Sequence, residues 1–174
     1  MLTQARLKEL LDYDSQTGIF VWKKYGNRTK HGKIAGTKHG DGYIRIGIDY
    51  KLYLAHRLAW LFVYGYMPVE LTDHINGIRN DNKISNLREC SSSQNSQNRQ
   101  RRNDNKSGFK GISWHKPAKK WQVFIKLNGQ SKYLGTFQDL SSAIEARKNA
   151  AIKLHGEFAN LSDAAITTPN KQGD

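Results

Sequence analysis

The stretch from Thr72 to Cys90, TDHINGIRNDNKISNLREC, decides how this sequence is interpreted. It sets Asp73 beside His74, passes through the turn signal Asn76-Gly77 and reaches an Asn-Leu-Arg run at 86–88. Asn and Asp side chains stabilise loops by bonding nearby backbone groups, so part of this composition is structural. The same stretch also contains the imidazole and the oxygen donors that phosphodiester hydrolysis requires.

Hydrolysis of a phosphodiester needs a base that activates water and a cation that offsets charge on the phosphate. His74 can be the base, while the carboxylate of Asp73 and the amide of Asn95 can hold a hard divalent ion such as Mg²⁺. Asp73 and His74 are neighbours on a predicted strand, so their side chains leave opposite faces. A hairpin followed by a helix would bring Asp73 and Asn95 together.

The other polar residues of the stretch allow a structural interpretation as well. We favour Asx turns and caps for three asparagines of the loop, Asn76, Asn80 and Asn82. A middle asparagine such as Asn86, which can bridge two loop backbones, would support a site without taking part in chemistry. His56 could contact a phosphate or be a structural histidine, and Cys90 is most simply a small buried residue.

Local patterns predict the elements before this stretch and the helix after it. Apolar periodicity, turn signals and stop signals indicate a helix over 2–11, a turn at 14–18, a strand at 19–22, a strand or hairpin over 43–54 and a helix over 56–64. Residues 23–42 show no periodic apolar face, which predicts a loop. Ser91 with Gln94 three residues later is a capping-box pattern, so a helix is expected to start there.

A polar, basic run then separates a second compact unit from the first. We place a first domain at 1–98, a linker at 99–106, a second domain at 107–161 and a tail at 162–174. Alternation around Trp121–Lys126 and the turn Asn128-Gly129 predict three antiparallel strands, with a helix following over 140–154. One face of the predicted sheet carries Ile112, Trp121, Val123, Ile125 and Leu134 and would pack on this helix.

Charge indicates the kind of partner. The 174 residues carry a net charge of +13, and residues 1–72, 73–109 and 110–174 each have more basic than acidic side chains. Such an even excess favours a chain that lies along a phosphate backbone. A single cysteine excludes a disulfide framework and a Cys-based zinc site. We expect no zinc, no membrane partner, no secretory signal and a cytoplasmic location.

The segment from His56-Arg57-Leu58-Ala59 through DHINGIRNDNKISNLR to QNSQN resembles the HNH homing endonucleases of the phage and intron-encoded kind. The resemblance spans roughly residues 15–100 and implies a ββα-metal fold in which two strands and a helix grip one divalent ion, Mg²⁺ or Mn²⁺. It further implies that His74 is the general base, that Asp73 and Asn95 are metal ligands and that Asn86 braces the hairpin. The third motif position is asparagine here rather than histidine.

The string KGISWHKPAKKWQVFIKLNGQSKYLGTF, followed by AIEARKNAA, is similar to the ethylene-response-factor type of DNA-binding domain over about residues 107–161. That domain reads DNA with the exposed face of a three-stranded sheet. Here Ser113, His115 and Lys126 stand where several base-reading arginines would be, so the resemblance does not predict a target sequence. The residues expected to bind DNA are Arg57, Arg99, Arg101, Arg102, Lys110, Ser113, His115, Gln122, Phe124, Lys126 and Tyr133.

Together these patterns predict an α+β protein with a ββα-metal nuclease domain, followed by a small three-stranded antiparallel sheet packed on one helix. The predicted function is a site-specific, homing-type endonuclease that binds double-stranded DNA as a monomer, nicks one strand per site and acts in a prokaryotic or phage-infected cell. Two alternatives stay open: a sequence-specific DNA-binding regulator with a non-catalytic HNH scaffold, and an RNA-binding protein.

Overall fold

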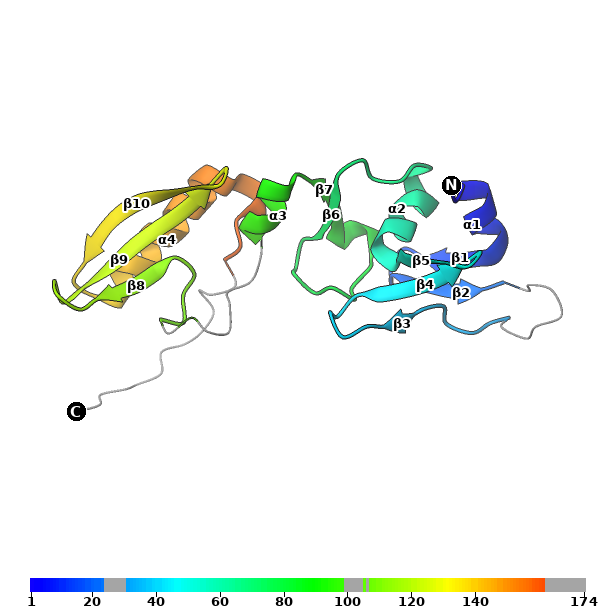
Figure 1. Ribbon diagram of the computed structural model, residues 1–174, viewed down its shortest axis with the longest axis horizontal. Helices are drawn as coiled ribbons and strands as arrows, with labels where there is room; N and C mark the ends of the chain where they lie inside the picture. Colours follow the sequence, from blue (N-terminus) through cyan, green and yellow to red (C-terminus); the bar gives the residue numbers. More distant parts are fainter. Residues whose placement is uncertain (24–30, 99–104, 106, 162–174) are drawn as a thin grey trace. The chain divides into compact units, whose positions relative to one another are not determined.

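The computed structural model describes residues 1–23, 31–98, 105 and 107–161. The chain forms two compact units, Met1–Ser92 and Ser93–Asp174. Each unit mixes helices with small antiparallel sheets (Figure 1), so the expected α+β class is confirmed. Arg99, Arg101 and Arg102, which the sequence suggests as DNA contacts, lie outside the described residues, as do the predicted tail and most of the predicted linker.

The first unit contains two α-helices and three small antiparallel sheets among its described residues. It begins with one helix, and the second helix follows the second sheet in the chain. In order, its elements are α1 (Gln4–Leu10), β1 (Leu11–Asp14), β2 (Ile19–Trp22), β3 (Thr37–Lys38), β4 (Ile44–Ile48), β5 (Lys51–Leu54), α2 (Ala55–Tyr64), β6 (Leu71–His74), the short 3₁₀ helix η1 (Ile84–Asn86) and β7 (Leu87–Cys90). The strands pair as β1-β2, β3-β4-β5 and β6-β7.

Local chemistry explains where these elements start and stop. The hydroxyl of Thr3 accepts a hydrogen bond from the backbone N–H of Arg6 and caps α1. The turn between β4 and β5 places Asp49 and Tyr50 at φ of 46° and 61°, the left-handed geometry of a tight hairpin turn. Gly65 ends α2 in the left-handed conformation at φ 85°.

A single apolar core joins the elements of the first unit. Leu7, Phe20, Ile46 and Leu58 are almost completely buried, and Leu87 extends this core to β7. Full burial of one such side chain stabilises a fold by roughly 1.5–3 kcal/mol. The core thus connects the N-terminal helix and hairpins with the strand pair that carries Asp73 and His74.

The β6-β7 pair is an open hairpin with a long connection. Asn76-Gly77 does form a turn, with the N–H of Gly77 bonded to the carbonyl of His74 over 2.9 Å, but the chain does not return there. It continues through residues 78–86 before β7 begins. The predicted turn at Asn76-Gly77 is therefore confirmed, but this turn does not close the hairpin between β6 and β7.

The second unit is a three-stranded sheet covered by one long helix. Its elements are α3 (Ser92–Asn98), β8 (Ile112–His115), β9 (Lys120–Leu127), β10 (Gln130–Phe137), α4 (Leu140–His155) and the 3₁₀ helix η2 (Gly156–Phe158). The strands lie in the order β10-β9-β8. Within this unit α4 runs along one side of the sheet (Figure 1).

The two faces of this sheet differ as the alternation predicts. Ile112, Val123 and Ile125 are buried on the face toward α4, while their neighbours in sequence turn the other way. Register shifts between Tyr133 and Gly135, where Gly135 at φ 129° permits a bulge in β10. Asp139 caps α4 by accepting from the N–H of Ser142 over 2.8 Å.

Most elements that the sequence predicts are confirmed, with three differences. The segment 23–42, predicted to be a loop, contributes strand β3, because its residues pair with β4. The first helix, predicted over 2–11, ends at Leu10. Leu11 is the first residue of β1 and is buried in the core. Helix α3 begins at Ser92 as the capping pattern suggests, but its contacts place it in the second unit.

No helix in the described part of the chain is both long and apolar enough to cross a membrane.

Candidate active site

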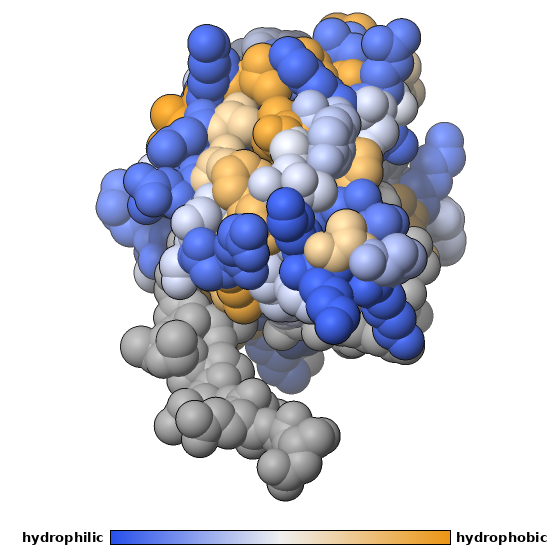
Figure 2. Space-filling view, turned by 90° about the vertical axis from the view of Figure 1, so that its left-hand side faces the viewer, coloured by the Kyte–Doolittle hydropathy of each residue, from blue (hydrophilic) through white to orange (hydrophobic). Residues whose placement is uncertain are grey.

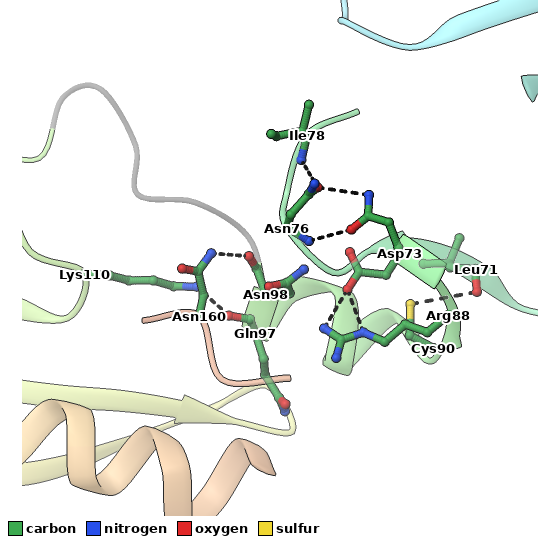
Figure 3. Close-up of polar contacts among 11 residues, drawn as sticks. Leu71, Asp73, Asn76, Ile78, Arg88, Cys90, Gln97, Asn98, Lys110 and Asn160 are labelled. Atoms are coloured by element: carbon green, nitrogen blue, oxygen red, sulfur yellow. Dashed lines mark hydrogen bonds and ion pairs between the residues drawn. The ribbon is translucent and has the colours of Figure 1, made fainter. Parts of the chain in front are cut away.

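The β6-β7 register sets the surroundings of Asp73. Asp73 lies opposite Arg88, and His74 lies opposite Leu87. The Arg88 guanidinium donates to Asp73 Oδ2 from Nε at 3.2 Å and from Nη2 at 3.0 Å (Figure 3). Both side chains are largely shielded from solvent. A cation approaching this carboxylate would share it with a guanidinium already in place.

His74 is buried among polar and aromatic groups of the same unit. Its ring is 4% exposed. Its Nε2 lies 3.1 Å from Oδ1 of Asn82. The ring of His56 packs edge-on at a centroid distance of 5.0 Å, and the ring of Tyr43 lies at 5.9 Å. Burial lowers the pKa of His74, although the bond to Asn82 and the charge of Asp73 act in the opposite direction.

Asn86 joins the two sides of the loop. Its Oδ1 accepts from the N–H of Asn76 at 3.0 Å, and its Nδ2 donates to Asn76 Oδ1 at 3.0 Å and to the carbonyl of Asp81 at 2.8 Å. The carbonyl of Asn86 also accepts from the N–H of Ile75. Asn76 in turn forms the expected Asx turn by accepting from the N–H of Ile78 (Figure 3).

His56, at the start of α2, is the second buried histidine of this cluster. It is 4% exposed, and within the described residues its Nδ1 has no hydrogen-bond partner. Burial, with His74 and Arg57 adding to it, lowers the pKa of His56 from 6.5 to about 3. The imidazole is therefore neutral at neutral pH, and it packs against His74 as an uncharged ring.

Arg57 is held by the backbone beyond α2. Its Nη2 donates to the carbonyl of Pro68 at 2.8 Å and its Nη1 to the carbonyl of Glu70 at 3.1 Å. These bonds tie α2 to the segment that enters β6. A role for Arg57 in DNA binding stays a prediction.

Helix α3, which carries Asn95, is fastened within the second unit. The Lys110 ammonium donates to the carbonyls of Gln97 at 2.9 Å and Ser96 at 3.3 Å. The amide of Asn160 donates to the carbonyl of Asn98 at 2.6 Å (Figure 3). The last carbonyls of a helix lack intrahelical partners, so these bonds complete its C-terminal end. Lys110, expected to bind DNA, is thus engaged with α3.

The outer face of the β8-β9-β10 sheet carries the remaining predicted DNA contacts. Ser113 pairs with Gln122, His115 with Lys120 and Tyr133 with Phe124. The rings of Phe124 and Tyr133 lie 5.2 Å apart, and Tyr133 is 52% exposed. Lys126 is exposed on the same face. Figure 2 shows hydrophobic residues flanked by many hydrophilic ones on the face it presents.

Sequence reasoning missed two residues beside the candidate base. The sequence favours an Asx turn or cap for Asn82, but its side chain lies within hydrogen-bonding distance of His74. Arg88 received no role, yet it pairs with Asp73. Alternation along β7 could have placed Arg88 opposite Asp73 once the register was known, whereas nothing in the spacing of Asn82 indicates its contact.

Among the described residues, no group of three or more His, Cys, Asp or Glu side chains could hold a metal ion. The metal ligands that the sequence suggests, Asp73 and Asn95, are not such a group, because they are only two residues and one of them is an amide. Asp73 belongs to the first unit and Asn95 to the second. Their joint role as ligands stays a prediction.

The chain matches a family model described as HNH endonuclease over residues 53–97. This range contains the end of β5, all of α2, the β6-β7 hairpin and most of α3. The matched residues therefore form an HNH endonuclease domain.

Among its relatives is Protein 3.8 of Escherichia phage T7, which is 30% identical over 113 residues, 64% of this chain and 93% of that protein. The chain belongs to the family of this phage protein and carries an HNH endonuclease domain. A solved structure, titled as DNA binding and cleavage by the HNH homing endonuclease I-HmuI, aligns at a TM-score of 0.41 and 20% identity, covering 84% of this chain and 85% of that chain.

We expect the substitution Asn86→Ala to lower the free energy of unfolding of the first unit by about 1–3 kcal/mol, because three hydrogen bonds across the loop are lost. Chemical denaturation followed by circular dichroism measures this. Asn80→Ala, at an exposed position of the same loop, is the matched control and should change little. Equal stability of the two variants would contradict the bracing role of Asn86.

The free energy of unfolding of the first unit should decrease as the pH is lowered. The pKa of His56 drops from 6.5 to about 3 on folding. Between these two pH values His56 is protonated in the unfolded chain and neutral in the folded chain. The free energy of unfolding should decrease by about 2 kcal/mol between pH 7 and 5. Denaturant titrations at several pH values measure the slope. His56→Gln should flatten it, and an unchanged slope in that variant would rule out this origin.

Proposed function

We propose that this chain is a site-specific DNA endonuclease of the homing type, with His74 as its general base. The observation that carries the proposal is the environment of His74 inside the matched HNH range: a buried imidazole whose pKa is lowered by burial, next to a carboxylate. An imidazole that is neutral at neutral pH can accept a proton from water. His74 would thereby activate water for attack on phosphorus.

HNH nucleases generally use a divalent metal ion, and we propose Asp73 and Asn95 as its ligands in this chain. Carboxylate and amide oxygens fit a hard cation such as Mg²⁺ or Mn²⁺, which keeps waters as further ligands. Once bound, the ion would stabilise charge on the scissile phosphate and the leaving oxygen. Arg88 would hold the Asp73 carboxylate in place before the ion arrives. Asn86 would keep the loop open around the site.

A single such site per chain acts on one strand at a time, so we propose a nick per binding event by a monomer, leaving a 5′ phosphate and a 3′ hydroxyl. Double-stranded DNA is the proposed substrate. The relation to a phage protein and the positive charge of the whole chain support it. The proposed setting is the cytoplasm of a prokaryotic or phage-infected cell.

We predict that purified protein with Mg²⁺ nicks supercoiled plasmid and that His74→Ala lowers the rate at least about 100-fold, because the general base is lost. Gel separation of nicked from supercoiled plasmid measures the rate, with exposed His31→Ala as the matched control. Asn95→Ala should lose most activity, while Asn95→Asp should keep metal binding. Binding without cleavage, or full activity of His74→Ala, would favour a regulator with a non-catalytic scaffold.

The second unit is proposed to be an ethylene-response-factor-like DNA reader. Its sheet turns one apolar face to α4 and leaves cationic, amide and aromatic side chains on the other. A sheet face of this kind can enter a major groove or follow the backbone. Phe124 and Tyr133 support a contact surface, because paired aromatic rings on an exposed face are unusual for a purely solvated one. Ser113, His115, Gln122 and Lys126 would contact DNA beside them.

We expect Lys126→Ala to weaken binding of duplex DNA and to reduce the slope of log affinity against log salt by about 1, since one phosphate contact is lost. Lys153→Ala removes an exposed charge from α4 and is the matched control, which should leave the slope unchanged. Fluorescence anisotropy at several salt concentrations measures both. Tighter binding of RNA than of duplex DNA at matched salt would instead favour the RNA-binding alternative.

A further inference from the structure

The β1-β2 hairpin, which precedes the range matched by the HNH model, contacts the loop between β6 and β7 around Asn82. The hydroxyl of Tyr13 donates to the backbone carbonyl of Asn82 at 2.7 Å. At the turn of the same hairpin, a Cβ placed on Gly18 would lie 2.5 Å from the carbonyl carbon of Asn82 and 2.5 Å from the nitrogen of Lys83. The peptide bond after Asn82 therefore lies directly against the hairpin.

Both hairpin residues are themselves held firmly. The ring of Tyr13 packs on Phe20 at a centroid distance of 4.6 Å and on Phe62 at 5.6 Å, so its hydroxyl points from a packed ring. Gly18 is buried at φ 74°, a conformation that disfavours any side chain, and its N–H bonds the carbonyl of Asp14 at 2.8 Å. The contact with Asn82 thus comes from a rigid part of the core.

From Asn82 the chain of contacts continues to the imidazole. Asn82 is 3% exposed, and its Oδ1 lies 3.1 Å from Nε2 of His74. A carbonyl oxygen only accepts hydrogen bonds, so Nε2 must carry the proton. In the neutral ring Nδ1 is then the nitrogen with a lone pair, and it is the atom that can accept a proton.

We propose that Tyr13 and Gly18 are positioning residues for DNA cleavage: they fix the backbone of Asn82, whose side chain holds His74 in the Nε2–H tautomer with Nδ1 as the proton acceptor. This inference rests on the proposed role of His74 as general base. It extends the functional site beyond the HNH segment to an N-terminal hairpin that contributes no residue to the chemistry. A displaced base slows the chemical step while leaving substrate binding nearly intact.

Two glycines provide a matched pair for the test. Gly18 and Gly32 both have φ 74°, but a Cβ at Gly32 would meet nothing within 4 Å. Gly18→Ala and Gly32→Ala therefore both place a side chain at the same positive φ, and only the first pushes on Asn82. In the plasmid assay we expect Gly18→Ala to lower kcat roughly tenfold relative to Gly32→Ala with KM unchanged. Equal kcat values for the two variants would overturn the proposal.

Tyr13→Phe removes the hydroxyl and keeps the packed ring, so it maintains the test if Gly18→Ala does not fold. Its expected effect is a loss of kcat of about fivefold, as for one hydrogen bond. Tyr50→Phe, at a fully exposed position, is the control. In an Asn82→Ala background the change Tyr13→Phe should cause no further loss, because the path to His74 is already broken. An undiminished loss there would show that Tyr13 does not act through Asn82.

Long-range ¹H–¹⁵N spectra of the histidine rings give a readout that does not depend on activity. We expect His74 in the Nε2–H form in the wild-type protein and in Gly32→Ala, and a loss of this preference in Asn82→Ala and Gly18→Ala. A proton on Nδ1 in the wild type would overturn the inference whether or not the protein cleaves DNA. The expected tautomer in a protein that fails to cleave would overturn the proposed function alone.

Discussion

The hydrogen bond between Asn82 and His74 is the constraint on which the candidate site depends. A buried imidazole needs partners for its nitrogens, and a buried amide needs partners of its own. Here the two residues satisfy each other at the inner end of a loop that has little apolar packing. Asn86 and Asn76 close the outer end with reciprocal bonds. Hydrogen bonds of asparagine side chains therefore hold the loop in one conformation, and apolar packing in the core holds the strands and helices around it.

The ionisable side chains near this hydrogen bond adapt to burial in two ways, by ion pairing and by a lowered pKa. Asp73 stays partnered by Arg88 across the hairpin, so its negative charge is balanced in a poorly solvated place. His74 and His56 respond to the same poor solvation through lowered pKa values, with burial as the first cause in both. One strand thus presents a paired carboxylate and a buried imidazole at adjacent positions.

The second unit packs one face of a small sheet on α4 and leaves side chains of the other face exposed. Val123 and Ile125 lie against α4, and the intervening residues of β9 turn outward. The same unit also holds α3, because Lys110 and Asn160 bond its last carbonyls. The helix that carries Asn95 is therefore part of the second unit, although the family match ends within that helix.

Local sequence patterns are enough to predict the helices and strands and the kinds of chemistry that the side chains allow. Alternation along β9, the capping pattern at Ser91 and the apolar run of α2 were all sufficient to predict strands and helices, because these features act over a few neighbouring residues. The adjacency of Asp73 and His74 was likewise visible in the sequence, and so was the loop-bracing potential of Asn86. Long-range packing, by contrast, places Arg88 opposite Asp73, Asn82 beside His74, and Tyr13 and Gly18 against Asn82. These contacts join residues up to 69 positions apart, and packing of the common core, rather than any local preference, brings them together.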